Sequence, residues 1–116
     1  MRHRKRGRKF GREKNVRNAL LRSLARSLIL RGRIKTTEAK AKEIRPAVER
    51  LVTKGKSNTV ASSREIFKRI PDKAVVKKLQ SGLGPKYLDR KGGYTRIIRI
   101  GRRVSDQASM VYIEFV

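Results

Sequence analysis

The chain has no cysteine, no tryptophan and one histidine among its 116 residues. Without cysteine it can form neither a disulfide framework nor a Cys-based metal or redox site. One histidine disfavours a His-rich metal site or a His-based catalytic triad. Acidic residues number only nine, and the eight after Glu13 are scattered singly, so no carboxylate cluster is available for two-metal or acid–base catalysis. These absences predict that the protein is not an enzyme and uses no cofactor or metal.

Long apolar runs are missing as well. The longest is about Met110–Ile113, whereas a membrane span needs about 18 residues. Arg22 and Arg26 interrupt the only stretch that could serve as a secretory signal. Residues 1–30 are rich in arginine, contain serine and are poor in acid, which is also typical of an organellar transit peptide. That alternative stays open at this point.

Positive charge is what the chain has in excess. The 33 Lys and Arg residues give a net charge of +24, and self-repulsion of this size is relieved by a polyanion. The candidates are nucleic acid, an anionic membrane surface and an acidic protein. Leu, Ile, Val and Phe make up about a quarter of the chain, more than the roughly one fifth typical of disordered proteins. The length fits one domain, so we expect a single folded domain over residues 13–116.

The first twelve residues differ from the rest. They hold seven Lys and Arg, two glycines and no acid, and such a block cannot bury enough apolar surface to order itself. We therefore expect a basic arm over residues 1–12 that is disordered when free and neutralises the phosphates of a nucleic acid. The alternatives are a solvated tail and a localisation signal.

Hydrophobic periodicity predicts an α+β fold. The expected helices run from Glu13 to Gly32, from Thr36 or Thr37 to Gly55, from Asn58 or Thr59 to Ile70, and through Val75–Leu83; the expected strands cover residues 33–36, 94–100 and 110–116. We expect Pro46 to kink the second helix and Gly84-Pro85 to act as a breaker in a turn-rich stretch. The prediction is a small mixed sheet of about three strands packed against about four helices, with an extended basic N-terminal arm.

Two glycine motifs partly resemble phosphate-binding loops, but neither has all the residues that such a loop requires. Gly55-Lys56-Ser57 matches the end of a P-loop, but Arg50 stands where that loop needs glycine and a helix precedes it. The G-x-G of Gly82 and Gly84 is not followed by the third glycine of a dinucleotide fingerprint and follows no strand.

The segment Arg90–Arg96 is more informative. Its Gly-Gly turn places N–H groups at the surface among basic side chains. Tyr94 can either stack on a base or ribose, or pack in the core, and the residues alone leave both interpretations open.

Four separated blocks carry a resemblance to a known family. They are MRHRKRGRKFGR at the start, IKTTEAKAKEIRPAVERL (Ile34–Leu51), LGPKYLDRKGGYTRI (Leu83–Ile97) and MVYIEFV at the end. In this order, from Met1 to Val116, they resemble the bacterial-type large-subunit ribosomal protein L17 family. The resemblance implies a structural component of the large ribosomal subunit with an α+β domain and no catalytic residues. It also implies that Met1 begins the protein and that nothing is cleaved.

The resemblance further implies the partners and the site. It implies binding to large-subunit ribosomal RNA near the rim of the peptide exit tunnel, beside other ribosomal proteins, in the cytoplasm or on an organellar ribosome. The family's basic start falls on Arg2, His3, Arg4, Lys5, Gly7, Arg8 and Arg12, its IKTT–KAK block on Lys35, Thr36, Thr37, Lys40 and Lys42, and its GGYTR turn on Gly92, Gly93, Tyr94, Thr95 and Arg96. All of these except Gly7 and Thr95 are expected to bind RNA. Basic character and position add Arg6, Lys9, Arg17, Arg22, Arg90 and Lys91.

Two other functions fit the charge. A DNA-compacting protein would bind duplex DNA and ribosomal RNA similarly, because charge does not distinguish the two. A membrane-active cationic peptide is a further alternative, against which the low aromatic content of 5% argues.

Overall fold

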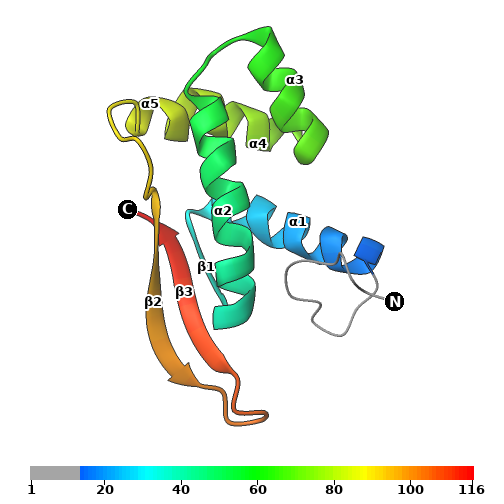
Figure 1. Ribbon diagram of the computed structural model, residues 1–116, viewed down its shortest axis with the longest axis vertical. Coiled ribbons are helices and arrows are strands. Elements are labelled where there is room, and N and C mark those ends of the chain that lie inside the picture. Colours follow the sequence, from blue (N-terminus) through cyan, green and yellow to red (C-terminus); the bar gives the residue numbers. More distant parts are fainter. Residues whose placement is uncertain (1–13) are drawn as a thin grey trace, which may run out of the picture.

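Residues 14–116 are described by the computed structural model shown in Figure 1; the predicted arm, residues 1–12, lies outside them. The helices are α1 (Lys14–Arg31), α2 (Glu38–Gly55), α3 (Val60–Arg69), α4 (Lys73–Lys78), a π-helical turn η1 (Leu79–Leu83) and α5 (Gly84–Lys86). The strands are β1 (Arg33–Thr37), β2 (Thr95–Arg102) and β3 (Ser109–Phe115). Since α4, η1 and α5 follow one another without a break, the described chain has four helical segments and a three-stranded sheet. The predicted α+β class is confirmed.

The sheet has the order β1-β3-β2 and is antiparallel throughout. The prediction of a mixed sheet is therefore wrong. β1 and β2 run in the same direction, but the C-terminal strand β3 lies between them and pairs with each in the opposite direction. On the face toward the helices, Ile113 is flanked by Ile34 and Ile97. A bulge between Arg99 and Gly101 shifts the register of β2.

Helix α2 lies at the centre of the molecule. Figure 1 shows it crossing from the sheet at one end to α3, α4 and α5 at the other. Of the two threonines expected at its start, Thr37 caps the first turn by accepting a hydrogen bond from the Lys40 N–H. The helix continues through Pro46 to Gly55. Its apolar face is buried from Ala41 to Val52 and packs against α1, the sheet and η1.

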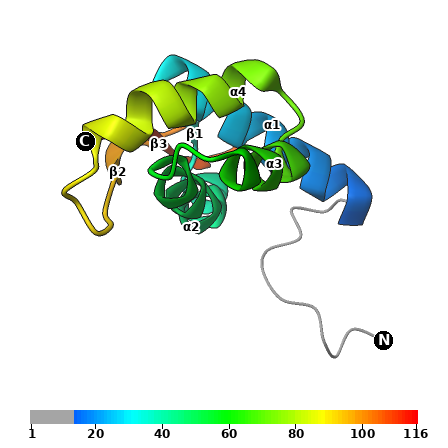
Figure 2. The same cartoon turned by 90° about the horizontal axis from the view of Figure 1, so that it is seen from above.

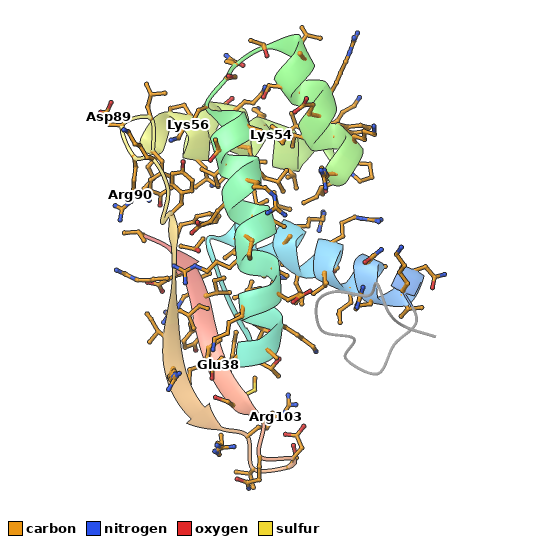
Figure 3. The ribbon with its side chains drawn as sticks, in the orientation of Figure 1. Glu38, Lys54, Lys56, Asp89, Arg90 and Arg103 are labelled. Carbon is orange, nitrogen blue, oxygen red and sulfur yellow. The ribbon has the colours of Figure 1, made fainter. Side chains whose placement is uncertain are left out.

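Both ends of the α2–sheet contact are fixed by polar side chains. Near the start of α2, Glu38 accepts hydrogen bonds from Arg99 of β2 and from the Ser109 hydroxyl of β3 (Figure 3). Hydrogen bonds from Lys42 and Ser109 hold the pKa of Glu38 below its ordinary value. Farther along the helix, Glu49 accepts from both the N–H and the hydroxyl of Thr95. These contacts fix the orientation of α2 on the sheet.

The segment expected to break at Gly84-Pro85 is helical instead. Gly84 has α-helical angles (φ −56°, ψ −57°) and Pro85 lies in the first turn of α5, where a missing N–H is tolerated. The reason is a backbone contact: Gly84 lies so close to Gly55 that a Cβ at Gly84 would be 2.3 Å from the Gly55 carbonyl oxygen. Glycine here permits close packing between α5 and the end of α2, rather than a turn.

Candidate nucleic-acid interface

Two basic clefts lie along the part of α2 that the sheet does not cover. The first, of about 550 Å³, lies between α1, α2 and α3 and is lined by five cations and one acid, Glu43. The second, of about 400 Å³, lies between α2 and the Gly92-Gly93 turn. Arg50 and Lys54 line both clefts. They are one helical turn apart and so project from the same side of α2.

We call the cations of the two clefts the basic band. Its members are Arg22 of α1, Arg50 and Lys54 of α2, Lys68 and Arg69 of α3, and Lys91 of the turn. Among them, only Lys54 forms an ion pair within residues 14–116, with Glu65. Each cleft is also lined by one acid, Glu43 in the first and Glu49 in the second, but cations outnumber acids in both. Since clefts lined mainly by one sign of charge concentrate the field between low-dielectric walls, the band is suited to attract a polyanion.

Hydrogen bonds from side chains of the folded domain hold the backbone of the turn over residues 90–93. The Lys56 ammonium and the Tyr94 hydroxyl both donate hydrogen bonds to the Arg90 carbonyl, and Figure 3 shows Lys56 and Arg90 close together at this turn. Gly93 has φ +63°, a conformation that glycine adopts without steric cost. The backbone is held by the core while the Arg90 and Lys91 side chains stay exposed.

Tyr94 is buried, and its proposed role in base stacking is wrong. Only 1% of the residue is exposed; its ring packs 5.3 Å from that of Tyr87, and its hydroxyl lies 3.1 Å from the Thr53 hydroxyl. Burial raises the pKa of the Tyr94 phenol, but hydrogen bonds from Lys56 and Thr53 outweigh it, so the pKa lies below its ordinary value. Of the two interpretations, core packing is confirmed.

The other predicted site residues do not gather in one place. Arg22, Lys91 and Gly92 line the clefts. Thr36 and Thr95 are buried, so their side chains are not available to RNA. Arg17 lies on α1, Lys40 and Lys42 lie near the start of α2, Thr37 caps that helix, and Lys35 and Arg96 lie on the outer face of the sheet. The residues predicted between Arg2 and Arg12 lie outside the described part of the chain.

The outer face of the sheet is another surface where predicted cations lie. Glu114 there forms ion pairs with Arg33 and Arg96, at 3.1 and 2.7 Å. The Arg33 guanidinium also lies 3.8 Å from the centre of the Tyr112 ring. Arg33 and Arg96 thus have partners within the protein, whereas most of the basic band has no ion-pair partner within residues 14–116, so the band is the stronger candidate for binding phosphate.

Sequence reasoning missed four members of the basic band: Arg50, Lys54, Lys68 and Arg69. The signal for Arg50 and Lys54 was available in their i, i+4 spacing on the polar side of a helix whose apolar stripe was recognised. No signal in the sequence placed Lys68 and Arg69 opposite them, since that depends on how α3 packs against α2.

Membrane insertion, metal binding and family membership are the remaining points that bear on function. Within residues 14–116, no helix is long and apolar enough to cross a membrane, and no group of three or more His, Asp or Glu side chains is arranged to hold a metal ion. Residues 20–116 match the family model described as ribosomal protein L17. The chain belongs to the ribosomal protein L17 family. Members of this family are structural proteins of the large ribosomal subunit rather than enzymes, and the resemblance noted from the sequence is confirmed.

Proposed function

We propose that this L17-family chain binds large-subunit ribosomal RNA through the basic band together with the basic residues of the 1–12 segment. The observation that carries the proposal is the pair of clefts sharing Arg50 and Lys54, in which cations outnumber acids and most of the cations have no ion-pair partner among residues 14–116. Phosphates supply most of the affinity, and RNA shape and 2′-hydroxyls supply the specificity.

The proposed cellular setting is the one that the family resemblance supports. The chain would lie near the rim of the peptide exit tunnel with other ribosomal proteins beside it, on a cytoplasmic or organellar ribosome. Its role there is to hold packed RNA helices together and not to catalyse a reaction. Arg22, Lys91 and the residues from Arg2 to Arg12 are the sequence-predicted contacts that this proposal keeps; Arg50, Lys54, Lys68 and Arg69 are added to them.

The test compares two double variants that each remove two positive charges. Arg50→Gln/Lys54→Gln alters the basic band, and Lys73→Gln/Lys77→Gln alters α4 outside it. Binding to folded large-subunit ribosomal RNA is measured over a salt series. Each phosphate contact contributes about 0.7 to 0.9 to the slope of log K against log salt, so the band variant should lose about 1.4 to 1.8 from the slope and at least tenfold in affinity. The α4 variant should change less.

Two outcomes would contradict the proposal. Equal losses in the two variants would show that charge alone, and not the band, determines binding. Equal affinity of the unmodified chain for ribosomal RNA and for a mixed-sequence DNA duplex at physiological salt would favour the DNA-compacting alternative.

A further inference from the structure

A further groove, in addition to the two basic clefts, lies between α3 and α4. Figure 2 shows these two helices side by side, seen from above. The groove has a volume of about 650 Å³ and shares only Lys68 with the first cleft. None of the interactions described above involves its other lining residues, so it needs a separate explanation.

The groove contains apolar side chains that the fold leaves uncovered. The sequence places Val60, Ile66, Phe67 and Ile70 on the apolar stripe of α3, yet only Ile66 and Ile70 are buried. Val60 is 68% exposed and Phe67 is 41% exposed, and both line the groove with the half-buried Val76 of α4. A cluster of exposed apolar residues rimmed by polar ones is typical of a protein-binding surface.

The rim of the groove is positively charged. Arg64 and Lys68 line it from α3, Lys73 and Lys77 line it from α4, and no acid does. None of these four forms an ion pair within residues 14–116, because the acids of this region are engaged elsewhere: Glu65 pairs with Lys54, and Asp72 pairs with Arg26. A ligand must therefore supply both apolar groups for the floor and negative charges for the rim.

We propose that this groove binds a segment of another protein that is apolar on one face and carries carboxylates along its edges. An amphipathic helix in a hydrophobic groove is a common form of such recognition. RNA fits less well: its phosphates would satisfy the rim but leave Val60 and Val76 exposed, and Phe67 is the only aromatic residue that lines the groove. The inference rests on the proposed function, since it makes the chain a link between ribosomal RNA and a protein neighbour.

The first experiment places a photoreactive group in the groove. Phe67→p-benzoylphenylalanine is incorporated into the full chain, large ribosomal subunits containing it are purified, and the crosslinked products are sequenced. We expect a crosslink to a protein segment with apolar residues at helical spacing and at least two nearby Asp or Glu residues. Leu88→p-benzoylphenylalanine is the control, because Leu88 is 62% exposed and does not line the groove; it should not crosslink to the same segment.

A matched pair of charge reversals tests the rim. Lys77 and Lys78 are neighbours on α4 and both are exposed, but only Lys77 lines the groove. In the Phe67 photoprobe background, Lys77→Glu should lower the yield of the protein crosslink several-fold, while Lys78→Glu should leave it unchanged. Equal effects of the two reversals would overturn the role assigned to the rim.

The outcomes separate the two proposals. A crosslink from Phe67 to RNA, or none in subunits that contain the chain, would overturn the inference and leave the proposed function intact. A crosslink from Leu88 to the same segment would show contact without selectivity and would also overturn the inference. Failure of the unmodified chain to enter large subunits would contradict the proposed function and this inference with it.

Discussion

At the scale of single residues, Gly84 shows how one backbone contact can determine the local structure. Its helical angles are those that alanine prefers, and on propensity alone alanine would be better by about 1 kcal/mol. Against this, a Cβ at Gly84 would lie 2.3 Å from the Gly55 oxygen and 2.7 Å from the Leu79 oxygen. Both are backbone atoms, which cannot move without displacing a helix, so the steric cost exceeds the gain in propensity.

Gly84→Ala should therefore lower the free energy of unfolding by about 2 kcal/mol or more, as overpacking in a core does. Gly82→Ala is the matched control, because its Cβ would meet only the Lys78 Cδ at 3.7 Å; it should leave stability unchanged or raise it. Denaturant unfolding of both variants measures the difference. Equal stability of the two would show that α2 and α5 are not as close as described.

At the scale of elements, the turn between β2 and β3 is held by one acid. Asp106 accepts two hydrogen bonds from the Arg103 guanidinium and one from the Ala108 N–H. These bonds favour the ionised carboxylate, and the Arg103 hydrogen bond is the largest cause of a pKa lowered from 3.8 to about 2. The favourable contribution of Asp106 is thus fully present above about pH 4 and is lost as the pH falls toward 2.

Arg103→Gln should raise the midpoint of the Asp106 titration from about 2 toward its ordinary value of 3.8. Arg102→Gln is the control, because Arg102 donates to the Gln107 carbonyl and not to Asp106. Carboxyl chemical shifts followed by NMR between pH 1.5 and 5 measure both. An unchanged midpoint in Arg103→Gln would mean that the Ala108 N–H, and not the guanidinium, sets the pKa.

The sequence was sufficient to predict elements whose signals are local. The start of α2 next to one of two candidate threonines, the end of α1 next to Gly32 and the strand near the C-terminus all depend on neighbouring residues, and each prediction is confirmed. Gly84-Pro85 was misread because a glycine that permits a turn and one that permits close packing look alike in a sequence. The antiparallel direction of β1 relative to β3 could not be predicted from the sequence either, since some 70 residues separate the paired strands.

The candidate site was predicted only in part, for a related reason. Arg22 and Lys91 were identified from charge and turn chemistry, but Arg50 and Lys54 matter because α1, α3 and the turn leave one side of α2 uncovered. Tyr94 fits either a stacking or a core role until its burial is known. Which cations share a surface is a property of packing, and packing involves residues far apart in the chain.

At the scale of the whole molecule, positive charge is concentrated toward the N-terminus. Residues 1–35 hold 14 of the 33 Lys and Arg and only one acid, and seven of these cations precede Glu13. The hydrophobic core is built by residues that lie well after this point, from Ala25 to Ile113. The segment before Glu13 thus supplies seven cations in addition to those of the basic band, while the core residues identified within 14–116 all lie after it.

Deleting residues 1–12 should therefore weaken binding to large-subunit ribosomal RNA without unfolding the rest of the chain. If all seven cations contact phosphates, the slope of log K against log salt should fall by about five to six. The melting temperature should be unchanged or higher, because the deletion removes seven like charges from a chain of net charge +24. Binding over a salt series and thermal unfolding of the truncated chain measure the two effects. Unchanged affinity would remove the segment from the interface and leave the basic band to account for RNA binding alone, whereas a lower melting temperature would show that the segment contributes to the fold.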